Sequence, residues 1–160
     1  RVGAGAGATV GKWAGLGTRV PGGIGIARAE EAGMQVAALA VVNAVGDVVA
    51  PDGSVIAGTT SPDPTWTAPG SAPPAGLSGT VLCVVALRAV FSKPACAFIA
   101  SRGSDGITVA VRPAHTRYDG DVVFAIAAPG KDAPGEERLD LAGVLATRAV
   151  AAAIRAAVPA

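Results

Sequence analysis

Two runs of apolar residues constrain the fold more than any other feature of this 160-residue chain. Residues 36–42 read VAALAVV and residues 81–87 read VLCVVAL, without a polar interruption in either. Each run has the length of a strand and is far shorter than the roughly 20 residues of a membrane-spanning helix. A continuous apolar strand, unlike an alternating one, is typical of a sheet that is covered on both faces. The sequence therefore predicts a layered fold built around a central sheet.

The segments around these runs predict a mixed α/β or α+β fold. Residues 46–50 (GDVVA) and 120–128 (GDVVFAIAA) are expected to form strands. Ser92 can cap a helix that has a proline in its first turn, although RGSDG at 102–106 is poor helix material. Residues 139–158 are apolar all round, which predicts a C-terminal helix packed on the sheet. A chain of this length with 51% hydrophobic residues can bury one core.

Composition argues against several classes of partner. The net charge is +1 and no basic run is present, so nothing indicates binding to nucleic acid. No apolar stretch predicts a membrane span, and the first residues do not form a signal peptide. Cys83 and Cys96 are too few for a disulfide framework, so we expect a reducing, cytoplasmic setting. A start at Arg1 rather than methionine leads us to expect an excerpt of a longer protein.

A proline-rich segment divides the chain into residues 1–79 and residues 80–160. Six of the 12 prolines lie in residues 51–79 among Ser, Thr, Gly and Asp, which predicts a loop or linker. The linker ends at Gly79, and Thr80 is expected to be the first residue of the buried strand. By itself, this step is most simply a threonine that begins a strand.

A threonine hydroxyl held beside a flexible peptide bond also suits an N→O acyl shift. In that reaction the Thr80 hydroxyl attacks the Gly79 carbonyl, and hydrolysis of the resulting ester leaves Thr80 as a new N-terminus. The freed α-amine, with a pKa of about 7.7–8.0, can act as the base for its own hydroxyl. Glycine before the bond removes steric bulk and tolerates a strained backbone.

Polar residues next to other predicted strands are further candidates. Asp119 and Asp121 flank one glycine, and in an extended segment their carboxylates project to the same side. Paired carboxylates can orient an amine and relay protons, although Asp-Gly is also ordinary turn chemistry. His115 lies close by, but the His, Asp and Cys residues match no familiar metal-ligand spacing, so no metal is expected and His115 is more simply a structural residue that forms hydrogen bonds. Asn43 either bonds its own turn or donates to an oxyanion.

The glycine-rich stretch at residues 3–13, GAGAGATVGKW, does not fit a nucleotide-binding loop. A phosphate loop needs glycine where Ala6 stands and a hydroxyl residue where Trp13 follows Lys12. The dinucleotide fingerprint GxGxxG also fails, ending on Ala8 or Val10. The glycines are therefore expected to allow close backbone packing, and a nucleotide-binding module is disfavoured.

Taken together, these segments resemble a known family. GAGAGATVGK, GGIG, VVNAVGDVV, the Gly79–Thr80 step before an apolar strand, and RPAHT followed by DGDVVFA occur in this order. The same order is found in the self-processing N-terminal-nucleophile peptidases, which include L-aminopeptidase/D-esterases, β-peptidyl aminopeptidases and the endo-type nylon-oligomer hydrolase. The resemblance spans essentially the whole chain. It implies an αββα sandwich, of which this chain is the C-terminal half, and autocleavage into two subunits.

The resemblance also implies roles for individual residues. Thr80 would be the nucleophile, Gly79 the residue released from it, and Asn43 an oxyanion or substrate-positioning group. Asp119 and Asp121 would be the acidic pair near the nucleophile, and Lys12 the active-site lysine of the glycine-rich segment. These roles describe hydrolysis of amide or ester bonds without a cofactor.

The partners implied by the resemblance are a small peptide or amide substrate and a further N-terminal half. That half supplies strands, a helix layer and an active-site tyrosine in family members, which assemble as homo-oligomers of processed heterodimers. No nucleic acid or membrane partner is expected. The alternative hypothesis is a non-catalytic homologue or incomplete fragment that only binds ligands or oligomerises.

Overall fold

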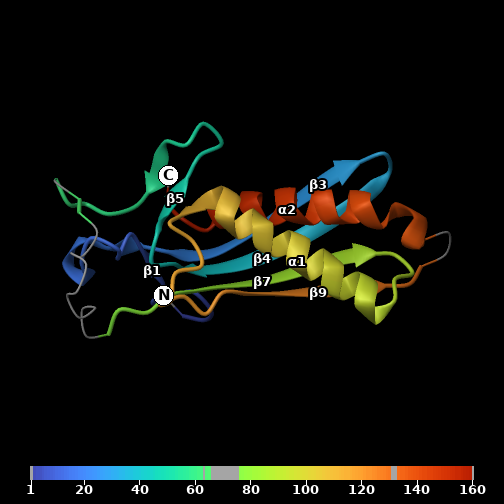
Figure 1. The fold of residues 1–160 in the computed structure, drawn as a ribbon, viewed down its shortest axis with the longest axis horizontal. Helices are drawn as coiled ribbons and strands as arrows, with labels where there is room; N and C mark the ends of the chain where they lie inside the picture. The colour runs from blue at the N-terminus through green and yellow to red at the C-terminus, as the bar shows by residue number, and fades with distance from the viewer. Residues whose placement is uncertain (1, 63, 66–75, 131–132, 160) are drawn as a thin grey trace.

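A computed structural model describes residues 2–62, 64–65, 76–130 and 133–159 of the chain. A four-stranded sheet in the order β3-β4-β7-β9 carries two helices on one face (Figure 1). These elements are β3 (Gly23–Glu31), β4 (Met34–Asn43), β7 (Thr80–Arg88), β9 (Val122–Ala128), α1 (Lys93–Ala110) and α2 (Leu139–Ala156). The predicted mixed α/β class is confirmed.

Short elements surround one end of this sheet. A two-stranded sheet pairs β1 with β2, and a three-stranded sheet has the order β6-β5-β8. These short elements are β1 (Thr9–Val10), η1 (Leu16–Thr18), β2 (Val20–Pro21), β5 (Asp47–Val49), β6 (Val55–Ala57) and β8 (Val111–Arg112). One further short element, η2 (Glu136–Arg138), lies at the other end of the sheet, where Arg138 donates to the Ala32 carbonyl in the β3–β4 turn.

The two apolar runs form the two central strands, β4 and β7, which pair antiparallel. On one side β3 pairs antiparallel with β4 through a turn in which Ala32 and Gly33 both have positive φ. Positive φ at both central residues is the conformation that a two-residue hairpin needs. On the other side β9 runs parallel to β7. The expected strand at residues 120–128 is thus confirmed, beginning at Val122.

Only one face of the sheet is covered by the residues that the structure describes, whereas continuous apolar runs predict cover on both. Along β4 and β7 every second residue is buried under the helices. The residues between them lie on the opposite face, which we call the open face. Its exposed large side chains are Ile24, Ile26, Leu82, Val122, Phe124 and Ile126.

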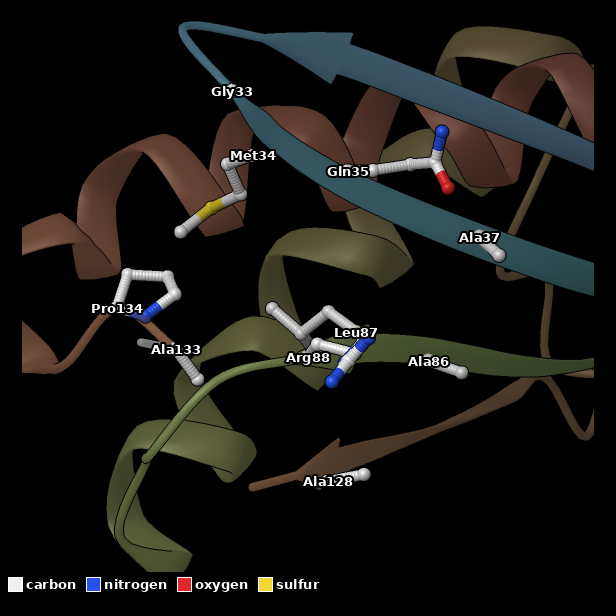
Figure 2. Close-up of a pocket in the computed structure, with 10 residues that line it drawn as sticks. All are labelled: Gly33, Met34, Gln35, Ala37, Ala86, Leu87, Arg88, Ala128, Ala133 and Pro134. Carbon is white, nitrogen blue, oxygen red and sulfur yellow. The ribbon is translucent and has the colours of Figure 1, made fainter. Parts of the chain in front are cut away.

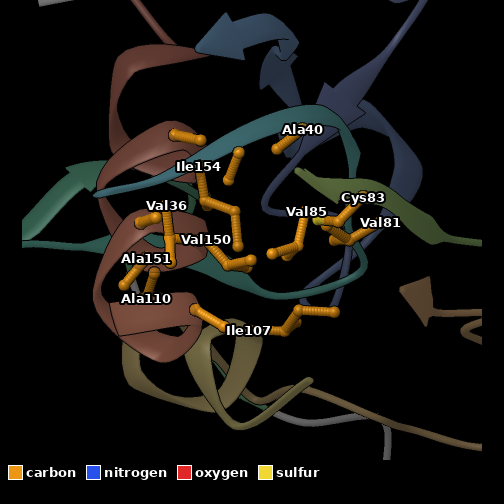
Figure 3. Packing of buried hydrophobic residues seen from close by; sticks show 14 of the residues in the cluster. Val36, Ala40, Val81, Cys83, Val85, Ile107, Ala110, Val150, Ala151 and Ile154 are labelled. Carbon is orange, nitrogen blue, oxygen red and sulfur yellow. The ribbon is translucent and has the colours of Figure 1, made fainter. Parts of the chain in front are cut away.

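Small and branched apolar side chains fill the space between the covered face and the helices (Figure 3), and glycines allow close approach there. A Cβ at Gly25 of β3 would lie 2.1 Å from the Ala153 carbonyl oxygen of α2, and one at Gly106 of α1 would lie 2.5 Å from that of Thr147. Within the RGSDG segment of α1, Gly106 thus lets α2 approach, while Gly103 lies against Val123 of β9 and Val85 of β7. Ser92 caps this helix as predicted, with its hydroxyl 3.3 Å from the Ala95 amide.

Besides the two-residue strands β1, β2 and β8, two longer strands were not predicted from the sequence. Strand β3 begins in the segment GGIG, which has the composition of a turn, and tertiary pairing with β4 overrides that local preference. Strand β6 lies inside the proline-rich segment, which is otherwise irregular where the structure describes it. Residues 63 and 66–75 of that expected linker lie outside the described residues.

Candidate active site

Thr80 is the first residue of β7, as predicted. Gly79 precedes it and forms an isolated bridge with Asp119, which lies before β9. We call the Gly79–Thr80 bond and its surroundings the junction. The Thr80 hydroxyl is 2.5 Å from the Gly79 carbonyl oxygen, and the Gly120 amide donates to the same oxygen at 3.0 Å. The Gly79 amide in turn donates to the Tyr118 carbonyl at 2.9 Å. The peptide group before Thr80 is therefore fixed from both sides, and its carbonyl already accepts from a backbone amide.

No residue other than glycine fits at position 79 without a local shift. A Cβ there would lie 2.2 Å from Asp119 Oδ1 and 2.8 Å from the Val45 amide nitrogen. Real Cβ atoms do not approach other heavy atoms so closely, so a side chain would displace the Asp119 carboxylate or the backbone at Val45. The packing at this bond thus depends on the absence of a side chain.

Lys12 reaches the same junction from the glycine-rich segment. Its side chain is 4% exposed, and its Nζ donates to the Ser78 carbonyl at 2.8 Å and to Asn43 Oδ1 at 2.9 Å. Gly11, with φ +73°, lets this segment lie against the backbone of Gly58, where a Cβ would come within 2.3 Å. The expected role of the glycines in close backbone packing is confirmed at this position.

Burial lowers the pKa of the Lys12 ammonium below its ordinary value of 10.5, while the nearby charge of Asp119 raises it in part. Between the lowered pKa and 10.5, the folded chain binds fewer protons at Lys12 than the unfolded chain. The contribution of Lys12 to the free energy of unfolding therefore rises with pH across that window.

Asn43 is the cross-strand partner of Thr80 in the β4–β7 pairing, so the two side chains lie on the same face. Its Oδ1 accepts from Lys12 Nζ and, at 3.0 Å, from the Thr9 amide. Among the described residues no acceptor binds Asn43 Nδ2. Because both donors fix the carbonyl end of the side chain, the amide nitrogen is the end left to donate to another molecule.

Asp119 and Asp121 flank the junction but do not share a partner. Asp119 accepts from the Val45 amide at 3.1 Å and from the Thr116 hydroxyl at 2.6 Å. Asp121 accepts from the Val81 amide at 2.7 Å, and its other oxygen lies 2.8 Å from Nδ1 of His115. The described contacts of both carboxylates are thus with backbone amides, a hydroxyl and an imidazole, on either side of Thr80.

The structure brings all of the predicted site residues to one end of the sheet. Two participants were not predicted: Gly120, whose amide binds the Gly79 carbonyl, and His115, which pairs with Asp121. Gly120 carries no sequence signal beyond its place between two aspartates. His115 was expected from the sequence to be a structural hydrogen-bonding residue rather than a metal ligand, but its pairing with Asp121 was not predicted.

Other kinds of site are not found in the described residues. Nowhere in the described ranges do three His, Cys, Asp or Glu side chains gather in a way that could hold a metal ion. Neither helix in the described part of the chain is both long and apolar enough to cross a bilayer. Cys83 and Cys96 are both free thiols.

A cavity of about 460 Å³ opens at the opposite end of the sheet (Figure 2). Met34 and Pro134 form one wall, and Arg88, at the end of β7, contributes a guanidinium. Thr80 and Arg88 are the two ends of one nine-residue strand, which places them about 26 Å apart. This cavity is therefore separate from the junction at Thr80.

A family model and the sequences of related proteins both place this chain among peptidases. The model of Peptidase family S58 matches residues 1–160. A protein named an uncharacterized aminopeptidase from Mycobacterium leprae (strain TN) is 38% identical over 132 residues, covering 76% of this chain and 36% of the relative. A similarly named protein from Mycobacterium tuberculosis (strain ATCC 25618 / H37Rv) is 34% identical over 138 residues, covering 72% and 38%.

Solved structures agree on the fold. A Burkholderia sp. beta-aminopeptidase superposes with a TM-score of 0.61 at 22% identity, covering 96% of this chain and 44% of the other. The L-aminopeptidase D-Ala-esterase/amidase from Ochrobactrum anthropi, described as a variant of the Ntn hydrolase fold, has a TM-score of 0.58 at 20% identity, covering 86% and 40%. The chain thus spans well under half the length of the relatives it matches.

Proposed function

This chain belongs to peptidase family S58, and from that premise we propose that it is a hydrolase of amide or ester bonds that generates its own nucleophile by cleavage between Gly79 and Thr80. The observation that carries the proposal is the position of the Gly79 carbonyl, which contacts the Thr80 hydroxyl and the Gly120 amide at once. A backbone amide in this position can stabilise negative charge that develops on the carbonyl oxygen.

The proposed self-cleavage proceeds by an acyl shift followed by hydrolysis. Thr80 Oγ1 bonds to the Gly79 carbonyl carbon, its proton passes to the Thr80 nitrogen, and the carbon–nitrogen bond breaks to leave an ester. Water then attacks the ester: its hydroxide bonds to the carbonyl carbon, the bond between that carbon and Oγ1 breaks, and Oγ1 takes up the remaining proton. The products are a carboxylic acid at Gly79 and a free α-amine on Thr80.

In the processed chain, the Thr80 amine would take the hydroxyl proton as Oγ1 attacks a substrate carbonyl. Asn43 Nδ2 would donate to the substrate oxyanion, since Lys12 and the Thr9 amide fix the opposite end of that side chain. Asp119 and Asp121 would stabilise the protonated amine by their charge. The proposed substrates are small peptides or amides.

Mass spectrometry of the purified chain tests the self-cleavage. We expect a fragment that begins at Thr80, its loss in Thr80→Ala, and its recovery in Thr80→Ser, which keeps a hydroxyl. Thr59→Ala is the matched control because Gly58–Thr59 is another Gly-Thr step in the chain. An intact wild-type chain after long incubation would remove self-processing and favour the non-catalytic alternative.

The acidic pair is tested in a processed, active enzyme. Replacing Asp119 or Asp121 by Asn should lower the catalytic rate by about 10²–10⁴, because each variant loses one positioned charge. The free energy of unfolding is measured in parallel. Full activity in both variants would assign the carboxylates to the support of backbone amides alone.

We also propose that the open face is covered by a further polypeptide segment, corresponding to the length of the relatives that this chain does not span, and that the covered units form homo-oligomers. The support is the exposed apolar side chains of that face together with the 36–44% coverage of the relatives. Co-expression with such an N-terminal segment should raise amidase activity. A well-behaved monomer that hydrolyses an aminoacyl anilide alone would contradict this proposal.

A further inference from the structure

The pairing of β7 with β9 is interrupted beside the candidate nucleophile. The parallel ladder begins at Leu82 and Val122, and the next contact toward the N-terminus is an isolated bridge between Gly79 and Asp119. In the gap, the Asp121 side chain accepts from the Val81 amide at 2.7 Å. A side chain therefore takes the place of a backbone partner at the residue that follows Thr80.

His115 fixes the carboxylate that fills this gap. Its Nδ1 lies 2.8 Å from Asp121 Oδ2, and the Asp121 side chain is only 4% exposed. An ionised carboxylate only accepts hydrogen bonds, so Nδ1 carries the proton in this pair. Both oxygens of Asp121 thus have one donor each, His115 on one side and Val81 on the other.

The backbone of His115 supports a specific placement of its ring. Its φ is +52°, in the left-handed region that residues other than glycine seldom adopt. On the far side of the ring, Nε2 lies 3.4 Å from the Ser104 hydroxyl of α1. The ring is therefore held between a helix and the loop that precedes β9.

The order Ser104–His115–Asp121 resembles the triad of serine hydrolases, but its setting does not suit a second nucleophile. Ser104 lies in the middle of α1, where the backbone amides are used by the helix and cannot form an oxyanion hole. Asp121, in contrast, binds the backbone amide of Val81, the residue next to Thr80. The hydrogen bonds of His115 and Asp121 therefore support the candidate nucleophile Thr80 rather than a second nucleophile at Ser104.

We propose that His115 is a positioning residue for Thr80: by holding Asp121 against the Val81 amide, it fixes the backbone that carries the nucleophile. The consequence for self-cleavage rests on the proposed function of Thr80. The positioning itself is independent of cleavage and is measured in the chain that carries Thr80→Ala.

Two substitutions at position 115 separate the side-chain contact from the backbone conformation. His115→Gly accepts a positive φ but removes the donor, whereas His115→Asn tolerates a positive φ and keeps a donor. In the Thr80→Ala chain, we expect His115→Gly to shift the Val81 amide proton resonance and to speed its hydrogen exchange. His115→Asn should restore both, and Ser104→Ala should change them less than His115→Gly.

In the chain that keeps Thr80, His115→Gly should slow self-cleavage on the order of 10²-fold, the effect of misplacing a reacting group by about 1 Å, and His115→Asn should recover most of the rate. An unchanged Val81 amide in His115→Gly, or no recovery in His115→Asn, would overturn the proposal. If wild-type chains fail to cleave, the proposed function fails, while the Val81 measurement still decides the positioning role.

Discussion

The two faces of the four-stranded sheet are built from alternate residues of the same strands, yet they differ completely in their surroundings. On the covered face, Val81, Cys83 and Val85 of β7 are fully buried under α1 and α2. On the open face, Phe124 and Ile126 of β9 are 54% and 55% exposed. Hydropathy alone does not distinguish the two sets, because both are apolar.

The difference indicates that the apolar residues of these strands have two separate roles: one set packs against the helices, and the other forms an exposed apolar surface. The covered face is satisfied within the chain, through helices that approach closely at Gly25 and Gly106. The open face carries an apolar surface of the kind that marks an interaction site. Thr80 and its partner Asn43 lie on the open face at the end of the sheet, and the next residue, Val81, is buried on the covered face.

The largest expected contrast is in thiol reactivity at two neighbouring positions of β7. Burial raises the pKa of the Cys83 thiol from 9.0 to about 12, which leaves about 10³-fold fewer thiolates at pH 8. Leu82→Cys places a thiol on the open face one residue away, where 41% of the leucine is exposed. With a thiol reagent, the introduced cysteine should react at least about 10³-fold faster than Cys83.

The pH dependence of that reaction has a definite sign. Below pH 12 the Cys83 thiol stays protonated, so its reaction accelerates continuously as the pH rises toward that value. Cys96, which is partly buried, is replaced by serine in all of these chains so that it does not contribute to the signal. Equal rates at positions 82 and 83 would mean that the covered face opens readily.

Isoleucine truncation compares the packing of the two faces directly. Ile107 is 0% exposed on the covered side and Ile126 is 55% exposed on the open face. Ile107→Ala should lower the free energy of unfolding by about 2–5 kcal/mol through lost burial and a cavity. Ile126→Ala should change it by no more than about 0.5 kcal/mol, as measured by urea denaturation. A comparable loss at both positions would show that the open face is already packed in solution.

Enlarging a small residue probes the reverse effect. Ala40→Leu inserts atoms into the fully buried side of β4 and should destabilise the chain by about 1–3 kcal/mol. Ala86 is exposed on the open face and lines the cavity near Arg88. The longer side chain of Ala86→Leu therefore has room to extend, and the stability of the chain should change little. Thermal denaturation of the two variants gives the comparison, and a larger loss for Ala86→Leu would contradict it.

The smallest expected effect on stability accompanies a change in association. Each of the substitutions Ile26→Ser and Phe124→Ser on the open face should alter the free energy of unfolding of the chain by no more than about 0.5 kcal/mol. The same change should lower the average molar mass in sedimentation experiments, because exposed apolar surface drives self-association. A wild-type chain that is already monomeric would show that this face does not pair copies of the chain.

Much of the candidate site was predictable because it depends on local sequence signals. The transition from a proline-rich segment to an apolar run places Thr80 at the start of β7. In the same way, a local signal places the start of α1, where the Ser92 hydroxyl accepts from the Ala95 amide. The partners of the carboxylates were not predictable in this way. Asp121 binds Val81, 40 residues earlier, and Asp119 binds Val45, 74 residues earlier.

The sequence by itself determined the strands β4, β7 and β9 and the C-terminal helix α2, and it determined that Gly79 and Thr80 meet at a strand start. It did not determine β3, which forms by pairing with β4. Hydrophobic periodicity and capping residues act over a few positions, so they are readable without the fold. Only the tertiary structure decided which face of β4 and β7 is covered. In runs made of Ala, Val and Leu, both faces have the same hydropathy, and the direction from which α1 and α2 approach is fixed by contacts between distant residues.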